Sequence, residues 1–312
     1  MPAKALYAGK PQDWPAYREA LPRAFKRAGI KVDLVAETTE PASIDYIIYA
    51  PDSPLQDFSP YTKLKAVLNL WAGVEKIRNN PTLKVPLARM VEAGMTQGMA
   101  EWVLGHAMRY HLGIDAHIHG QDGLWRNDFT PPLAHNRVVG ILGMGALGQA
   151  CAAQLRNVGF QVKGWSRRKK RISGTECFSG EDGLNRVLRE AEILVLLMPV
   201  TEETENLLSA ERLGQMPQGA RIINPGRGQL IDDDALLAAL DQGRIGHATL
   251  DVFRQEPLPY GHPFWDHPRV TVTPHIASAT RVDSSADTIA ENIRRGEAGA
   301  PFLHLVDPET GY

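Results

Sequence analysis

The chain has few cysteines, no long hydrophobic run and almost no net charge. Only two of its 312 residues are cysteines, Cys151 and Cys177, and their spacing fits neither a disulfide framework nor a metal site. This composition predicts a reducing, cytoplasmic environment and no bound metal. No apolar run approaches the roughly 20 residues that a membrane span needs, and the first residues lack the apolar core of a signal peptide. The formal net charge of −2 gives no reason to expect nucleic acid or an anionic membrane as a partner.

A glycine-rich turn lies near the middle of the chain. The apolar run 138–142 enters Gly143-Met144-Gly145-Ala146-Leu147-Gly148, and a helix-compatible segment follows. In such a turn the first glycine permits the tight bend, the second lets the backbone approach a pyrophosphate, and the third lets the helix pack close to the strand. The start of the helix then offers unpaired N–H groups to the phosphates. We therefore predict a dinucleotide-binding unit with cofactor contacts along 143–148.

The residues after the next strand, expected over 160–165, indicate which dinucleotide binds. About 20 residues beyond the turn, NAD enzymes place an acidic residue on the ribose 2′-hydroxyl. Here the chain reads Ser166-Arg167-Arg168-Lys169-Lys170-Arg171. A carboxylate would repel a 2′-phosphate, whereas a hydroxyl and guanidinium groups bind one. We predict NADPH as the cofactor, with NADH weaker, and 2′-phosphate contacts at Ser166, Arg167 and Arg168. The alternative is that the basic run is only a solvated loop.

Alternating apolar runs and helical patterns predict an α/β fold of two Rossmann-like or flavodoxin-like lobes with parallel sheets. In the first lobe we expect a helix over 14–28, closed by Gly29, and strands over 5–8, 31–35, 46–50 and 66–70. A long helix over 96–119 precedes the second lobe, which begins near Arg137 and has later strands over 193–198, 221–224, 248–252 and 270–273. A helix over 281–297 is expected to return to the first lobe.

These elements predict two domains. Residues 1–103 and 282–312 would form a substrate-binding (catalytic) domain, and residues 104–281 an NADP-binding Rossmann domain. The substrate is expected in the cleft between them, at the carboxyl ends of the strands.

Three polar sites follow strands of the second lobe. Arg227 stands between glycines after the strand 221–224, and its planar fork suits a carboxylate. His275 follows the strand 270–273, and histidine is the side chain best suited to give and take a proton near neutral pH. Glu256 would hold the tautomer of His275 and favour its protonated form. Each has a plainer alternative, because a lone Arg often forms a surface ion pair, a lone His is more often structural, and Glu256 beside Pro257 can cap a helix.

Taken together, these segments resemble the D-isomer-specific 2-hydroxyacid dehydrogenases. The matching stretches occur in family order across most of the chain, at 71–77, 143–148, 198–204, 224–228, 250–258 and 268–277. Within the family, the chain is most similar to the glyoxylate/hydroxypyruvate reductase branch. That similarity rests on Gly-Trp-Ser-Arg at 164–167, Glu-Pro-Leu-Pro at 256–259 and a C-terminal Gly-Tyr.

The resemblance implies a role for each matching position. Arg227 would bind the substrate carboxylate and carbonyl, His275 would be the acid/base, and Glu256 would be its partner. The resemblance also implies substrate contacts at Trp71, Ala72, Gly73 and Val74. The backbone of 72–74 would hold the substrate carboxylate. Further cofactor contacts are implied at Met144, Ala146, Leu147, Pro199, Thr204 and Asp251. Of these, Asp251 would lie near the nicotinamide carboxamide. Pro225 departs from the family pattern, in which a small residue is common, and it removes one backbone N–H from this loop.

The predicted function is NADPH-dependent reduction of small 2-oxo acids, glyoxylate to glycolate and hydroxypyruvate to glycerate, by hydride transfer with His275 as acid/base. The resemblance and the long apolar helix at 96–119 also predict a homodimer. Two alternatives stay open at this point. One is a nucleotide-sensing binding protein of the same fold, and the other is a reductase of a bulkier 2-oxo acid.

Overall fold

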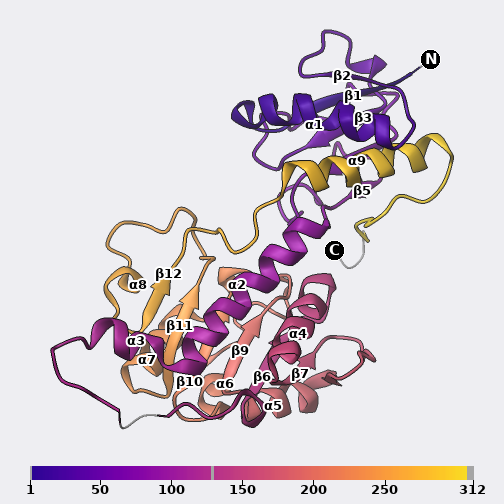
Figure 1. Ribbon diagram of the computed structural model, residues 1–312. Coiled ribbons are helices and arrows are strands. Elements are labelled where there is room, and N and C mark those ends of the chain that lie inside the picture. The colour runs from indigo at the N-terminus through magenta and orange to yellow at the C-terminus, as the bar shows by residue number, and fades with distance from the viewer. Residues whose placement is uncertain (1, 128–129, 308–312) are drawn as a thin grey trace. The chain divides into compact units, whose positions relative to one another are not determined.

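The chain folds into two compact units, each built around a parallel sheet (Figure 1). The computed structural model describes residues 2–127 and 130–307. The first unit contains the chain up to Met95 and from Thr280 onward, and the second contains Thr96–Ala279. This division differs from the boundaries expected at 103/104 and 281/282, because the helix that crosses between the units packs into the second one from Met99 onward.

The first unit has a five-stranded sheet in the order β2-β1-β3-β4-β5. Its strands are β1 (Ala3–Ala8), β2 (Val32–Val35), β3 (Tyr46–Tyr49), β4 (Ala66–Asn69) and β5 (Leu87–Ala88). Helices α1 (Trp14–Arg27) and α9 (Val282–Glu297) pack against each other (Figure 1) and share one apolar core, to which Leu21, Phe25, Ile289 and Ile293 belong. The expected return of the C-terminal helix to the first lobe is therefore confirmed.

The second unit has a seven-stranded sheet in the order β12-β11-β10-β9-β6-β7-β8. In chain order these strands are β6 (Val138–Leu142), β7 (Gln161–Trp165), β8 (Glu176–Phe178), β9 (Ile193–Leu196), β10 (Ala220–Asn224), β11 (Ile245–Leu250) and β12 (Val270–Val272). Its helices are α2 (Ala93–Leu112, from Thr96 onward), α3 (Ile114–His119), α4 (Ala146–Val158), α5 (Gly180–Glu190), α6 (Ala210–Gln215), α7 (Asp233–Asp241) and α8 (Pro263–Asp266).

Helices cover both faces of this sheet, which is why the central strands β9 and β6 contain no polar side chain. In β9, Ile193 and Val195 join the core formed with α2 and α4, whereas Leu194 and Leu196 join the core formed with α5, α6 and α7. Successive side chains of a strand point to opposite faces, so a strand covered on both sides has no polar alternation.

The structure corrects the expected helix over 96–119. Gly113 adopts a left-handed conformation with φ of +65°, which ends α2 at Leu112 and starts α3 at Ile114. The short strands β5 and β8 were not among the predicted elements, because runs of two and three residues show no usable periodicity. The C-terminal Gly311-Tyr312, part of the branch similarity, lies outside the described residues.

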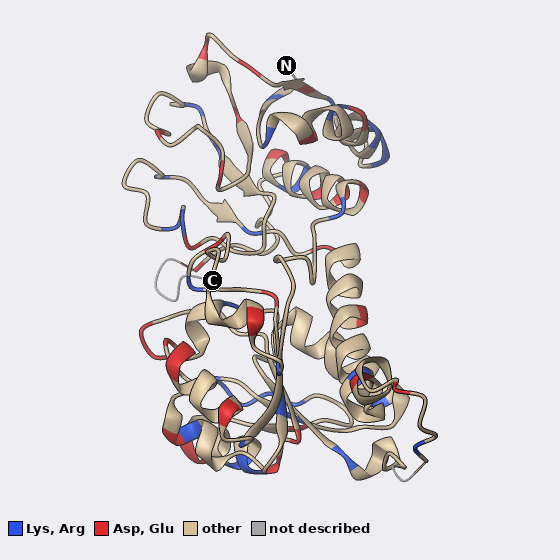
Figure 2. Cartoon of the chain, turned by 90° about the vertical axis from the view of Figure 1, so that its left-hand side faces the viewer, with Lys and Arg blue, Asp and Glu red and all other residues tan. Residues whose placement is uncertain are grey.

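Charges of both signs are interspersed over each unit (Figure 2). This distribution agrees with the near-zero net charge of the whole chain, formally −2. Within residues 2–127 and 130–307, no helix combines the length and the apolar composition that crossing a bilayer would require.

Candidate active site

The three predicted catalytic residues follow three neighbouring strands of the seven-stranded sheet. Arg227 comes after β10, Glu256 after β11 and His275 after β12, and these strands are adjacent in the order β12-β11-β10. Because the strands are parallel, their carboxyl ends lie at one edge of the sheet. The fold therefore gathers segments that are far apart in the sequence.

His275 and Glu256 form a hydrogen-bonded pair. His275 Nδ1 lies 2.7 Å from Glu256 Oε2, and the Phe253 backbone N–H donates to Glu256 Oε1 at 2.9 Å. Burial opposes ionisation of Glu256, but the hydrogen bonds from His275 and Phe253 and the nearby positive charges outweigh it and lower the pKa of this carboxyl. With Nδ1 donating to Glu256, Nε2 is the ring nitrogen that can exchange a proton with a ligand.

Asp251 holds the turn that presents His275. Its carboxylate is fully buried and accepts hydrogen bonds from Thr273 Oγ1 at 2.6 Å and from the backbone N–H groups of Ile276 and Ala277 at 2.9 Å. The turn needs this support because His275 has a φ of +54°, a region that non-glycine residues rarely adopt. In this structure Asp251 is thus a buried support, and its contact with the nicotinamide stays a prediction.

The Arg227 loop is organised by the buried side chain of Asn224. Asn224 Nδ2 donates to the Arg227 carbonyl at 3.0 Å, and its Oδ1 accepts from the Gly226 N–H at 3.1 Å. These bonds hold the loop although Pro225 offers no N–H of its own. A side chain at Gly228 would place its Cβ 2.1 Å from the Phe253 carbonyl carbon, so glycine is required where this loop meets the segment after β11.

The glycine turn has the geometry that its sequence predicts. Gly143 has a φ of +106°, and a Cβ there would lie 2.3 Å from the Leu197 carbonyl oxygen. A Cβ at Gly148 would lie 2.0 Å from the Gly143 carbonyl oxygen, whereas a Cβ at Gly145 would meet nothing within 4 Å. Gly145 therefore faces open space at the start of α4, where a pyrophosphate would approach. The Met144 side chain is buried against Gly164, so a cofactor contact at Met144 would have to come from its backbone.

The basic loop after β7 is fastened to the glycine turn. The Gly143 N–H donates to the Trp165 carbonyl at 2.8 Å, and Lys170 Nζ donates to the Met144 carbonyl at 2.7 Å. The hydroxyl of Ser166 donates to the Arg168 carbonyl, and Arg167 and Arg168 are both exposed. The sequence analysis did not single out Lys170, although the run of basic residues that contains it was the available signal.

Pro199 and Thr204 lie in one turn after β9. Thr204 Oγ1 donates to the Pro199 carbonyl at 2.9 Å and accepts from the Thr201 N–H at 2.7 Å. The segment is attached to the strand before the glycine turn, because the Leu197 N–H donates to the Leu142 carbonyl at 2.7 Å. The segment that carries both predicted cofactor positions therefore starts beside that turn.

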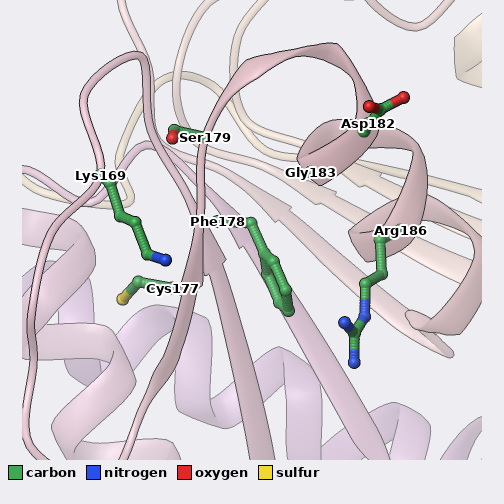
Figure 3. Close-up of a pocket in the computed structure, with 7 residues that line it drawn as sticks. All are labelled: Lys169, Cys177, Phe178, Ser179, Asp182, Gly183 and Arg186. Carbon is green, nitrogen blue, oxygen red and sulfur yellow. The ribbon is translucent and has the colours of Figure 1, made fainter.

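A pocket of about 270 Å³ lies between the basic loop and the start of α5 (Figure 3). Lys169 lines one side and Arg186 the other, with Phe178 between them. Arg186 packs 4.8 Å from the centre of the Phe178 ring and forms ion pairs with two glutamates, Glu176 and Glu190. The predicted catalytic residues do not line this pocket, and we assign it no ligand.

In the first unit, the loop after β4 is shaped by Asn69. This side chain is buried, and its Nδ2 donates to the carbonyls of Trp71 at 2.8 Å and Gly73 at 3.0 Å. In a trans peptide the C=O and the following N–H point in opposite directions. The N–H groups of Ala72 and Val74 therefore point away from Asn69. A polar residue at the end of the apolar strand β4 was the sequence signal for this arrangement, and the sequence analysis missed it.

Comparison with known proteins identifies the family. The model of the D-isomer specific 2-hydroxyacid dehydrogenase, NAD binding domain, matches residues 103–277. A glyoxylate/hydroxypyruvate reductase A of Yersinia enterocolitica is 39% identical over 284 residues, which cover 88% of this chain and 89% of that protein. The chain therefore belongs to the D-isomer specific 2-hydroxyacid dehydrogenase family.

Solved structures give the same result for the whole chain. A D-isomer specific 2-hydroxyacid dehydrogenase from Xanthobacter autotrophicus Py2, in complex with NADPH and MES, has a TM-score of 0.92 and 38% identity, and the match covers 100% of both chains. An NADPH-dependent glyoxylate/hydroxypyruvate reductase from Sinorhizobium meliloti, in complex with NADP and sulfate, has a TM-score of 0.84 and 33% identity. That match covers 99% of this chain and 100% of the other.

Proposed function

We propose that this protein is an NADPH-dependent reductase of small 2-oxo acids, with glyoxylate and hydroxypyruvate as substrates. The observation that carries the proposal is the His275–Glu256 pair at the same sheet edge as the Arg227 loop. A proton donor beside a permanently charged carboxylate binder is what reduction of a 2-oxo acid requires. The names of the relatives in Yersinia enterocolitica and Sinorhizobium meliloti support the same substrates.

Each of the three side chains has one task in this reaction. The guanidinium of Arg227 binds the substrate carboxylate and turns the carbonyl carbon toward the cofactor. Bound NADPH supplies a hydride to that carbon. His275 Nε2 donates its proton to the carbonyl oxygen, so that the product is the 2-hydroxy acid. Glu256 remains ionised, in keeping with its lowered pKa, and stabilises the protonated imidazole before the transfer.

The second unit fits NADPH at two places. Gly145 leaves room for the pyrophosphate, and α4 directs its N–H groups to the same point. The loop after β7 supplies the hydroxyl of Ser166 and the guanidinium groups of Arg167 and Arg168 for the 2′-phosphate. Relatives of known structure are complexes with NADPH or NADP, which supports this choice of cofactor.

The loop at 71–74 is the proposed contribution of the first unit to substrate binding. The N–H groups of Ala72 and Val74 point away from the buried Asn69, which holds the intervening carbonyls. Two N–H groups that point in this way suit the oxygens of a carboxylate.

We also propose a cytoplasmic homodimer. Helix α3 and the residues just after it expose large apolar side chains, Ile118 at 58%, Leu124 at 69% and Trp125 at 92%. Strong exposure of several large apolar side chains is typical of a surface that a partner covers. Both cysteines are free, which supports a reducing compartment. Sedimentation of the purified protein, and of a Trp125→Ser variant, tests the dimer.

The decisive experiment follows NADPH oxidation with a panel of 2-oxo acids, and repeats it with NADH. We expect the highest kcat/KM for glyoxylate or hydroxypyruvate with NADPH. Tight NADPH binding with negligible turnover on every acid would instead indicate a nucleotide-sensing binding protein. If kcat/KM were highest for a branched or aromatic 2-oxo acid, the proposed reaction would stand and the proposed substrates would be wrong.

A further inference from the structure

Glu92 is a buried carboxylate that binds the starts of two helices at once. Its side chain is 4% exposed, and each of its two oxygens accepts one hydrogen bond from each helix start. Oε1 accepts from the Met95 N–H at 2.6 Å and from the Arg281 N–H at 3.1 Å. Oε2 accepts from the Gly94 N–H at 2.5 Å and from the Ser284 hydroxyl at 2.5 Å. Glu92 therefore caps α2 and α9 together, where an ordinary capping side chain serves one helix.

These two helix starts are the places where the chain leaves and re-enters the first unit. The chain passes into the second unit after Met95, inside α2, and returns at Thr280, just before α9. Gly94 permits the two segments to touch, since a Cβ there would lie 2.6 Å from Arg281 Cγ and 3.0 Å from Ser284 Oγ. All of these atoms belong to the first unit, so the hydrogen bonds of Glu92 do not depend on how the second unit is placed.

Both segments are also bonded to the loop after β4. The Met90 N–H donates to the Trp71 carbonyl at 3.0 Å, just before α2. Thr280 Oγ1 donates to the Leu70 carbonyl at 2.8 Å, just before α9. The loop at 70–74 is therefore attached to the outgoing and the returning segment, and Glu92 ties these two segments to each other.

We propose that Glu92 is a positioning residue for substrate binding. It locks the two connections between the units into one rigid piece and thereby fixes the backbone of the 70–74 loop. This inference rests on the proposed role of that loop in binding the substrate carboxylate. Glu92 itself does not contact the substrate. Its effect reaches the substrate only through the positions of Trp71 to Val74.

The test compares Glu92→Gln and Ser284→Ala with the wild type. An amide at position 92 sets an NH₂ group against two donors, whereas Ser284→Ala removes one bond to α9 and leaves the cap of α2 intact. We expect Glu92→Gln to raise the KM for the 2-oxo acid about threefold to tenfold and to leave the KM for NADPH within about twofold. Ser284→Ala should also raise the KM for the 2-oxo acid, but by a smaller factor than Glu92→Gln does.

The matched control is Asp232→Ala, which removes the side chain that caps α7 in the second unit by accepting from the Ala235 N–H at 3.0 Å. This control should lower Tm, as any lost cap does, without raising the KM for the 2-oxo acid. Hydrogen exchange gives a readout that is independent of activity. In Glu92→Gln, exchange should accelerate at the amides of 70–74 as well as at Gly94, Met95 and Arg281.

Two results would overturn the proposal. One is a lower Tm for Glu92→Gln with an unchanged KM for the 2-oxo acid. The other is faster exchange confined to the helix starts, with the 70–74 amides unaffected. If the wild type reduces no 2-oxo acid, the proposed function fails, while the exchange experiment still decides whether Glu92 holds the loop. Should Glu92→Gln not fold, Ser284→Ala decides both questions.

Discussion

Replacing Glu256 with glutamine tests the proton-donor pair directly. The Nδ1–Oε2 distance of 2.7 Å is that of a charge-assisted hydrogen bond. Such bonds contribute about 1.5–3 kcal/mol when shielded from water. Here the side chains are 52% and 36% exposed for His275 and Glu256, so solvent screening places the contribution nearer to about 1–2 kcal/mol. At 1.4 kcal/mol per factor of ten, we expect kcat for reduction to fall roughly fivefold to thirtyfold.

The pH profile gives a second and more specific readout. The ionised carboxylate stabilises the protonated imidazole that reduction consumes. Glutamine cannot ionise, so the low-pH dependence of kcat/KM for reduction that follows protonation of the Glu256 carboxyl, whose pKa is lowered, should be absent from Glu256→Gln.

The assay is initial-rate NADPH oxidation across a pH series, with Asp241→Asn as the matched control. Asp241 faces His267 Nε2 at 3.3 Å in the same unit, as a histidine–carboxylate pair outside the site. The control should leave both kcat and the profile unchanged. If Glu256→Gln retained the wild-type profile and at least half of its kcat, Glu256 would not be the functional partner of His275.

Further predictions concern the acid, the cofactor loop and two half-buried histidines. His275→Ala should lower turnover by at least about a hundredfold, with His267→Ala as control, and unchanged turnover would remove the acid/base assignment. Arg167→Ala with Arg168→Ala should raise the KM for NADPH at least about tenfold and that for NADH less than about threefold; equal effects would contradict the 2′-phosphate site. Burial lowers the pKa of His106 and of His247 from 6.5 to about 4. As the pH falls from 6.5 to about 4, these histidines therefore take up protons in the unfolded chain before they do so in the folded protein. Their full contribution to the free energy of unfolding is present only above this window. At about pH 5 the loss should be roughly 1–2 kcal/mol per histidine. Urea unfolding of His247→Gln should show a smaller loss of unfolding free energy, as the pH falls, than the wild type shows. If the variant kept the wild-type pH dependence, His247 would not be a source of this loss.

The sequence by itself determined the features that depend on local chemistry. The glycine turn at 143–148 could be read because a tight bend and close helix packing each require a residue without a side chain. The strands β3, β4 and β9 could be placed because their apolar runs are flanked by turn residues. Arg227, Glu256 and His275 could be proposed because each follows such a strand, and parallel strands end at one edge.

Only the tertiary structure decided which groups support these residues. Nothing local in the sequence shows that Asp251 holds the turn of His275, or that Glu92 joins two helix starts that lie 189 positions apart along the chain. Such contacts depend on where distant segments meet, and a buried carboxylate or amide is stable only where those segments supply its hydrogen-bond partners. Sequence periodicity records burial, but it does not record which partners the burial brings together.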